Sequence, residues 1–475
     1  MARLRCPFAG LWPRIATGAL IILFAALASA SLAGPRPAYN VILITLDTTR
    51  ADHLGVYGYR KPTSAVLDGF ASEAAVFEMG ISQAALTPVS HASILTGLYP
   101  YHHRLRLMHG LVENVLPENQ TTLAEVWRSS GGQTAAFISA YPAGSAFGLQ
   151  QGFSKFDDTF PHADGEGLVD KNGVVNTGKS QRRADATTDA ALRWMKGFQK
   201  NDKPFLMWVH YFDPHDAYIL PPRTLTDSLM YGALAPAGND DASIGRAMYD
   251  CDVYYMDRQI GRLFAELKRR NLWDRTIVVV VGDHGEGLGD HNWWTHGILY
   301  QEQIRVPYIV RVPRLPAGRR IASLVRSIDL MPTILEAAEI PPAAWPKMDG
   351  ESLVRTIRTG ATDDSLVAYS GAVNICMYAR PDKLGELDEK TDKLYCLMNA
   401  RYKFIYHQLV PQESELYDLS VDPKELRNLY EKSSPIVTRL LKDLRARRAI
   451  TGIMPGMTPA DLERMRRLES LGYIN

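Results

Sequence analysis

Long apolar runs that end abruptly in polar residues recur along the chain. Residues 39–47, 203–213 and 275–287 are rich in β-branched or aromatic residues and end in polar clusters, as buried strands of a parallel sheet do. Two more strands are predicted at residues 133–139 and 306–313, and helices at 121–131, 249–273 and 325–340. Strands that alternate with helices predict an α/β fold with a doubly wound, mostly parallel sheet flanked by helices on both faces.

The pattern changes to shorter runs near the C-terminus. Residues 366–372, 393–408 and 414–423 are typical of an antiparallel sheet, and residues 433–449 predict a helix. We therefore expect three parts: an N-terminal segment at 1–34, a large α/β domain at 38–360, and a smaller C-terminal α+β subdomain with a tail at 361–475.

The N-terminal segment has its own hydrophobic pattern. Arg3, Arg5 and Arg14 precede an uncharged run at residues 15–34 that ends in small residues. A basic region, an apolar core and small terminal residues predict a secretory signal. Since about 20 uncharged residues can just span a bilayer, a retained membrane anchor is the alternative. Both interpretations predict a periplasmic or secreted catalytic domain, with membrane contact only through this segment.

The charge balance narrows the classes of binding partner. The chain carries 53 basic and 52 acidic residues and no basic stripe, so we exclude nucleic acid as a partner.

The chain contains four cysteines. Cys251 lies in a predicted helix and is expected to be a buried thiol. Cys376 and Cys396 could pair in an oxidising compartment, although their spacing does not decide this.

Polar residues gather where three of the predicted strands end. Ligands bind at the carboxyl ends of strands in open α/β sheets, and carboxylates with neutral imidazoles are the usual ligands of a divalent metal. A fourth polar segment, beginning at Thr87, precedes a predicted helix, whose N-terminus would attract anions. The residues at the strand ends are Asp47; His210, Asp213, His215 and Asp216; and Asp283, His284, Glu286, Asp290 and His291.

Each cluster also has a purely structural interpretation. Thr87 and Ser90 could cap the helix that follows, because hydroxyl side chains commonly accept from the first helical N–H groups. The segments around Asp213 and Asp283 could be solvated turns. Taken singly, these interpretations are the more common ones. Their coincidence at three separate strand ends favours a functional site.

Five segments of the chain resemble motifs of a known family. From the N-terminus to the C-terminus they read NVILITLDTTRADHLGVYGY, TPVSHASILTGLYP, VVVVGDHGEGLGDH, HGILYQEQIRVPYIVRVP and ELYDLSVDPKELRNL. They are similar to motifs of the sulfatase family of the alkaline phosphatase superfamily, in the same order and across nearly all of the chain after residue 34. The resemblance implies an alkaline phosphatase-like fold and hydrolysis of an ester.

The chain departs from the family at the nucleophile. Sulfatases carry a cysteine that is oxidised to formylglycine, and Thr87 stands in its place, with Ser90 and His91 in the places of the motif's serine and arginine. A threonine hydroxyl needs a neighbouring cation to attack at neutral pH. The resemblance implies that one divalent ion is held by Asp47, Asp283 and His284, with the Thr87 oxygen as a further ligand.

The donor set and the rest of the pocket differ from the family as well. Thr48 replaces a second aspartate, so zinc or manganese fits better than calcium or magnesium. His296 stands where the family has a lysine, and His215 matches its substrate histidine. The resemblance therefore implies the following site: Thr87, His91, His215 and His296 as catalytic residues, Ser90 and His291 as substrate-binding residues, and Asp47, Thr87, Asp283 and His284 as metal ligands.

These features predict a metal-dependent hydrolase of phosphate or phosphonate diesters or of sulfate esters, with Thr87 as nucleophile. The substrate would be a small-molecule, glycan or lipid ester. Two alternatives are an envelope transferase of the phosphoethanolamine or phosphoglycerol type and a catalytically inactive binding protein with the same fold. Transferases of this kind usually have several membrane spans, and an inactive protein has no need to keep the four ligand groups together.

Overall fold

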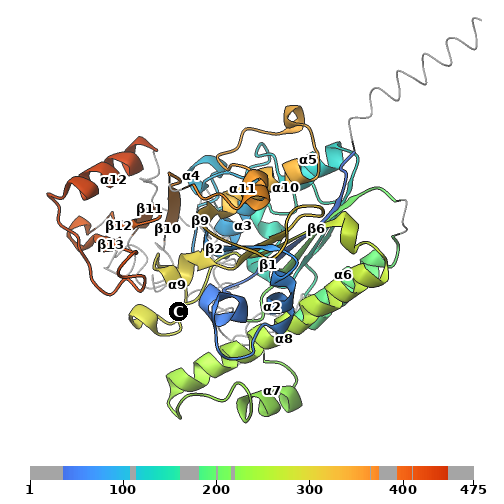
Figure 1. Cartoon of the computed structure of the whole chain (residues 1–475), viewed down its shortest axis with the longest axis horizontal. Coiled ribbons are helices and arrows are strands. Elements are labelled where there is room, and N and C mark those ends of the chain that lie inside the picture. The colour runs from blue at the N-terminus through green and yellow to red at the C-terminus, as the bar shows by residue number, and fades with distance from the viewer. Residues whose placement is uncertain are drawn as a thin grey trace, which may run out of the picture.

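A central mixed sheet and a small antiparallel sheet form the framework of the molecule (Figure 1). The computed structural model describes residues 36–106, 114–160, 181–198, 202–215, 220–363, 365–373, 393–408 and 410–447. The proposed signal segment, Cys376 and the C-terminal tail lie outside these residues.

The central sheet has nine strands, and its middle strands are parallel and fully buried. Their β-branched and aromatic residues pack on both faces of the sheet, which explains the long apolar runs. The order across the sheet is β4 (Lys155–Asp157), β3 (Gln133–Ile138), β5 (Phe205–Tyr211), β1 (Asn40–Leu46), β6 (Thr276–Gly282), β8 (Tyr308–Arg311), β2 (Ala75–Ile81) and β7 (Arg305–Val306), and β9 (Arg319–Arg326) pairs with β2.

Helices cover both faces of this sheet, as predicted. Alternate residues of β1 enter two different cores: Val41 and Leu43 enter one, and Ile42 and Ile44 enter the other. The first core is completed by α3 (Thr87–Thr96), α5 (Leu123–Ser129), α10 (Leu330–Ala337) and α11 (Val354–Thr359). The second is completed by α2 (Ala65–Ala71), α6 (Ala184–Met195) and α8 (Asp241–Arg269). The α/β prediction is therefore confirmed.

The segment predicted as one helix at 325–340 is divided in the structure. Strand β9 continues to Arg326, and α10 begins only at Leu330. The Asp329 carboxylate accepts hydrogen bonds from the backbone N–H of Arg326 at 2.8 Å and from its guanidinium at 2.8 and 3.1 Å. This ion pair stabilises a 3₁₀ turn between the strand and the helix, which the apolar pattern alone does not reveal.

The C-terminal part contains an antiparallel four-stranded sheet covered by one helix. Its strands are β10 (Ala368–Val373), β11 (Lys393–Met398), β12 (Tyr402–His407) and β13 (Glu415–Asp418). Helix α12 (Pro435–Ala446) packs on this sheet through Val437, Leu440 and Leu444. A bridge between Ala84 and Gly371 connects the sheet to the segment that precedes α3. The predicted smaller α+β unit is present.

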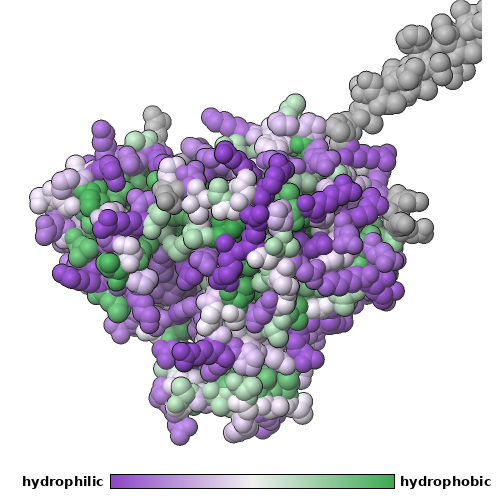
Figure 2. Space-filling model, viewed as in Figure 1, coloured by the Kyte–Doolittle hydropathy of each residue, from purple (hydrophilic) through white to green (hydrophobic). Residues whose placement is uncertain are grey.

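Polar residues dominate the face of the molecule seen in Figure 2.

The thiols of Cys251 and Cys396 are buried, and burial raises the pKa of each to about 12. In the described part of the chain, no helix is both long and apolar enough to span a bilayer.

Candidate active site

Two adjacent parallel strands bring three polar side chains together. Strands β1 and β6 are in register at Leu46 and Gly282, so the residues that follow them emerge at the same edge of the sheet. These residues are Asp47, Asp283 and His284, and all three are fully buried. One ligand atom from each lies within 4.8 Å of the others. The parallel sheet therefore brings together the three side chains that the family resemblance implies as metal ligands.

Each carboxylate in the cluster keeps one oxygen that accepts no hydrogen bond from the described residues. Asp283 Oδ1 accepts from the backbone N–H groups of Thr48 at 3.2 Å and His284 at 2.6 Å, and Asp47 Oδ2 accepts from His210 Nε2 at 3.0 Å. Asp47 Oδ1 and Asp283 Oδ2 are buried without a hydrogen-bond partner among the described residues. Burial raises the pKa of both carboxyl groups, and the proximity of Asp47 adds to the effect on Asp283. A divalent cation would satisfy both orphaned oxygens and offset their repulsion.

The imidazole of His284 is oriented as a metal ligand would be. Its Nδ1 donates to the backbone oxygen of Gly285 at 2.9 Å, which leaves the Nε2 lone pair directed into the cluster. Burial lowers the pKa of His284, so the ring is neutral. Thr87 Oγ1 lies 3.2 Å from this Nε2. Two carboxylate oxygens, one imidazole nitrogen and one hydroxyl oxygen fit one divalent cation.

Thr87 is the first residue of α3 and does not cap it. The N-cap is Leu86, whose side chain makes no capping hydrogen bond. The Thr87 side chain is fully buried, with its hydroxyl beside His284. The structural interpretation of this threonine as a helix cap is therefore not supported by the geometry.

His91 supports the first turn of α3 from within the protein. Its Nδ1 donates to the backbone oxygen of Thr87 at 2.8 Å, and its Nε2 accepts from Thr45 Oγ1 at 2.9 Å. Trp208 Nε1 donates to the same hydroxyl at 2.9 Å, which fixes the direction of this chain of hydrogen bonds. Burial lowers the pKa of His91, consistent with a neutral ring. Because both nitrogens are occupied, we assign His91 a positioning role instead of the expected catalytic one.

His215 and His296 lie beside the cluster and face each other. Their Nε2 atoms are 3.2 Å apart, and the rings of His296 and His284 have centroids 4.4 Å apart. His296 Nδ1 donates to the backbone oxygen of Ala85 at 2.9 Å, and burial lowers the pKa of His296 to about 4. A neutral His296 can therefore only accept through Nε2, so the shared proton is carried by His215 Nε2.

The two predicted substrate-binding residues lie elsewhere. Ser90 Oγ donates to the backbone oxygen of Asp283 at 2.7 Å and is fully buried, so it joins α3 to the loop after β6. His291 Nδ1 contacts Glu302 Oε1 at 2.8 Å, and its ring stacks on Tyr300 with centroids 3.8 Å apart. These contacts do not place either side chain beside Thr87, so we do not carry the substrate-binding roles forward.

His210 is a supporting residue to which the sequence analysis gave no role. It pairs with Thr45 in the register of β5 and β1, which places it behind Asp47. Its Nδ1 accepts from the backbone N–H of Ser139 at 3.4 Å, so its Nε2 carries the proton donated to Asp47. Burial lowers the pKa of His210 to about 3. A histidine near the end of a buried strand was the only signal in the sequence.

We expect His210→Ala to weaken divalent-metal affinity by about 10- to 100-fold, because the Asp47 carboxylate would lose the donor that orients it. Competition with a chromogenic chelator would measure this affinity. His103→Ala is the matched control, since His103 is equally buried but hydrogen-bonds Ser93 at 3.0 Å, outside the cluster. Equal metal affinity in the two variants would contradict the supporting role of His210.

Comparisons with known proteins identify the family. The model of the sulfatase family matches residues 39–340, and a model described as N-sulphoglucosamine sulphohydrolase, C-terminal, matches residues 289–449. The first match contains every residue of the cluster, and the second contains the antiparallel sheet.

Several curated relatives and solved structures are similar over most of the chain. A protein of Trinickia caryophylli described as a multifunctional alkaline phosphatase superfamily protein is 26% identical, covering 85% of this chain and 93% of the relative. An N-acetylglucosamine-6-O-sulfatase of Bacteroides thetaiotaomicron is 24% identical, covering 87% of both chains. The crystal structure of a phosphonate monoester hydrolase of Agrobacterium radiobacter has a TM-score of 0.65 at 20% identity, covering 87% of this chain and 96% of that one. Since the family model spans more than half of the sequence, the chain belongs to the sulfatase family of the alkaline phosphatase superfamily.

Proposed function

We propose that this protein hydrolyses phosphate or phosphonate diesters or sulfate esters with Thr87 as the nucleophile. The observation that carries the proposal is the position of Thr87 Oγ1, 3.2 Å from His284 Nε2 and beside two carboxylates with orphaned oxygens. Similarity to a sulfatase and to a phosphonate monoester hydrolase supports a sulfuric or phosphoric ester as substrate.

Asp47, Asp283 and His284 would hold one divalent cation, with Thr87 as a further ligand. When bound, the cation supplies positive charge that lowers the pKa of the Thr87 hydroxyl and offsets charge that develops on the ester. The protein prepares the remaining geometry. His210 orients Asp47, the backbone N–H groups of Thr48 and His284 orient Asp283, and the His91 hydrogen bond fixes the first turn of α3.

The reaction we propose has two displacement steps. Thr87 Oγ1 loses its proton to solvent and forms a bond to phosphorus or sulfur, while the bond to the ester oxygen opposite it breaks. His215 Nε2 gives its proton to that departing oxygen. Water then attacks the covalent intermediate and its proton returns to His215, while the bond to Thr87 Oγ1 breaks and that oxygen takes a proton back from solvent. His296, which accepts from His215 at 3.2 Å, holds the proton donor in place between turnovers.

The proton-donor role of His215 predicts a dependence on the leaving group. We expect His215→Gln to slow hydrolysis of alkyl esters by about 10²- to 10⁴-fold and that of nitrophenyl esters much less, because a good leaving group needs no proton. Measuring kcat/KM across phenols of graded acidity would show a steeper slope in the variant. His102→Gln is a control on a half-exposed histidine that contacts Asp349. An unchanged slope in His215→Gln would rule out His215 as the acid.

The charge of the site predicts a preference among esters. The family's lysine is replaced by His296, and the low pKa of His296 makes this position neutral at pH 7. A site with less positive charge binds a singly charged ester better than a doubly charged one. We therefore expect aryl phosphodiesters, phosphonate monoesters and sulfate esters to be hydrolysed at least about tenfold faster, in kcat/KM, than the corresponding phosphate monoester. A phosphate monoester as the best substrate of the panel would contradict this preference.

We also propose that residues 1–34 direct the protein out of the cytoplasm, as a cleaved signal or as an anchor. This rests on the basic, apolar and small-residue pattern of the segment. The substrate would then be a small-molecule, glycan or lipid ester outside the cytoplasm.

A further inference from the structure

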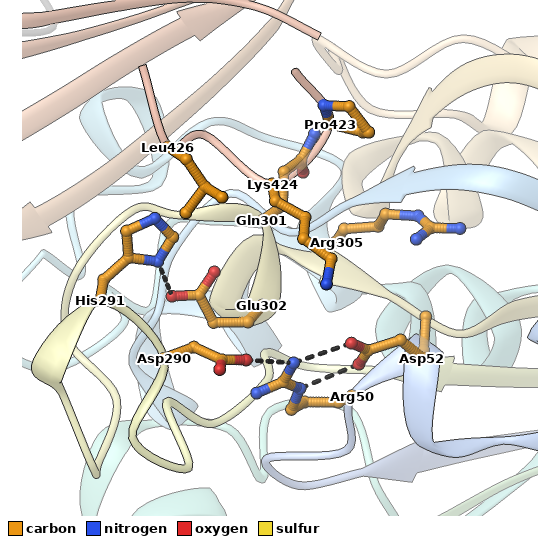
Figure 3. A pocket seen from close by; sticks show the side chains of 11 residues that line it. Arg50, Asp52, Asp290, His291, Gln301, Glu302, Arg305, Pro423, Lys424 and Leu426 are labelled. Atoms are coloured by element: carbon orange, nitrogen blue, oxygen red, sulfur yellow. Dashed lines mark hydrogen bonds and ion pairs between the residues drawn. The ribbon is translucent and has the colours of Figure 1, made fainter. Parts of the chain in front are cut away.

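A pocket of about 480 Å³ lies where the catalytic part of the chain meets the C-terminal part (Figure 3). Its walls come from residues 50–52, 290–291, 301–302, 305, 423–424 and 426. The volume is within the range of small-molecule sites. None of the residues given a role in the reaction lines this pocket: Asp47, Thr87, His215, Asp283, His284 and His296 all lie elsewhere.

An ion-pair network forms one wall of the pocket. The Arg50 guanidinium contacts Asp52 Oδ2 at 2.7 Å and Asp290 Oδ2 at 2.8 Å. Only 6% of the Arg50 side chain is exposed, whereas about half of each aspartate side chain is. The guanidinium also donates to the backbone oxygens of Glu286 and Gly287 at 3.3 and 3.1 Å, which fixes it behind the loop that follows β6. This wall therefore presents the carboxylates of Asp52 and Asp290 to the pocket.

A second wall contains a charged histidine. His291 Nδ1 contacts Glu302 Oε1 at 2.8 Å, and its Nε2 contacts the backbone oxygen of Glu425 at 3.2 Å. Both partners accept hydrogen bonds, so both ring nitrogens carry protons. Burial is the largest single influence and lowers the pKa of His291, but the hydrogen bond and charge of Glu302, together with those of Glu425, raise the pKa overall. The histidine and Glu302 therefore neutralise each other.

Two cations of the pocket are not neutralised in this way. Lys424 extends its ammonium group into the pocket, and among the described residues it makes no hydrogen bond or ion pair (Figure 3). Arg305 uses its Nε to donate to the backbone oxygen of Glu78 at 2.9 Å, and its two terminal nitrogens make no such contact with the described residues. Four cationic side chains thus face the three carboxylates of Asp52, Asp290 and Glu302.

We propose that this pocket binds a hydroxylated organic anion of the size of an acidic mono- or disaccharide. The anionic group of the ligand would contact the ammonium of Lys424 and the guanidinium of Arg305. A planar guanidinium favours groups that offer two oxygens, such as a carboxylate. Carboxylate oxygens only accept hydrogen bonds, so Asp290 and Glu302 select hydroxyl donors on the same ligand. Leu426, which is 77% exposed, offers an apolar surface for the carbon face of a sugar ring.

Calorimetric titration of the full chain with D-glucuronate and with glucose 6-sulfate tests this site with two kinds of oxyanion. We expect saturable binding of at least one of them, retention of that binding in Asp283→Asn, and a loss of at least about tenfold in affinity in Lys424→Ala. Lys432→Ala is the matched control, because Lys432 is exposed in the same C-terminal part and lines no wall of the pocket.

Three outcomes would overturn the proposal. They are the absence of saturable binding by both probes, equal binding of neutral D-glucose, and unchanged affinity in Lys424→Ala. Because binding is measured without turnover, the result is independent of whether Thr87 is the nucleophile.

Discussion

Replacing Thr87 with alanine is expected to lower kcat toward an aryl phosphodiester by roughly a thousandfold or more, because the attacking oxygen would be absent. The Thr87 side chain is buried at the start of α3, and its hydroxyl contacts His284 instead of capping the helix. The fold should therefore persist. Steady-state kinetics together with the thermal unfolding midpoint would separate lost chemistry from lost structure.

Two variants control this experiment. Thr87→Ser retains a hydroxyl at the same position and should keep measurable turnover. Ser93→Ala removes another buried hydroxyl of α3, one that contacts His103 at 3.0 Å, and should leave kcat within a few-fold of the original. Full activity in Thr87→Ala would exclude Thr87 as the nucleophile.

Asp283→Asn is expected to have the second large effect, a loss of divalent-metal affinity exceeding about 100-fold. Substitution of a residue that merely supports a ligand costs about 10- to 100-fold, and Asp283 supplies a ligand atom directly. The amide would lower the negative charge of the cluster while nearly preserving side-chain volume. Elemental analysis after dialysis, and the metal concentration needed to restore activity, would both report the change.

Asp257→Asn is the matched control for this variant. Asp257 is also a buried carboxylate, but it lies in α8 and accepts from the backbone N–H groups of Val66 and Leu67 at 2.8 and 2.9 Å. It does not belong to the cluster of Asp47, Asp283 and His284. Its substitution should reduce stability and leave metal content unchanged. If Asp283→Asn retained metal as well as Asp257→Asn does, the proposed ligand set would be wrong.

The centre of the fold was predictable because its strands are buried on both faces. The long apolar runs of β1, β5 and β6 have no other simple explanation in a chain of ordinary composition. Strands β2 and β9 were missed because they mix apolar residues with charged ones, such as Glu78 and Arg320, which form an ion pair at the edge of the sheet. Strands β2 and β9 lie far apart in the sequence, and the hydrophobic pattern of either segment alone does not reveal that they pair.

The position of the cluster was predictable for a related reason, but the orientation of the histidines around it was not. Parallel strands place Asp47, Asp283 and His284 at one edge of the sheet wherever the strands end. Which way an imidazole turns depends on neighbours that are remote in sequence. His91 Nε2 accepts from Thr45 and His210 Nε2 donates to Asp47, and neither contact could be read from the local sequence.

The charged pocket at the C-terminal part could not be predicted from the sequence either. It brings Arg50, His291 and Lys424 together from three distant parts of the chain. Each of these side chains has an ordinary context in the sequence. Only the packing of the C-terminal part against the catalytic part makes them neighbours.

The most direct test of the central claim is to trap the covalent intermediate. Metal-loaded protein would be mixed with a reactive aryl phosphodiester, quenched in acid during the first turnover, digested and analysed by peptide mass spectrometry. We predict that the substrate's phosphoryl group is attached to Thr87, and that the adduct is absent from Thr87→Ala. A first turnover that releases the phenol while Thr87 stays unmodified and another residue carries the group would contradict the account.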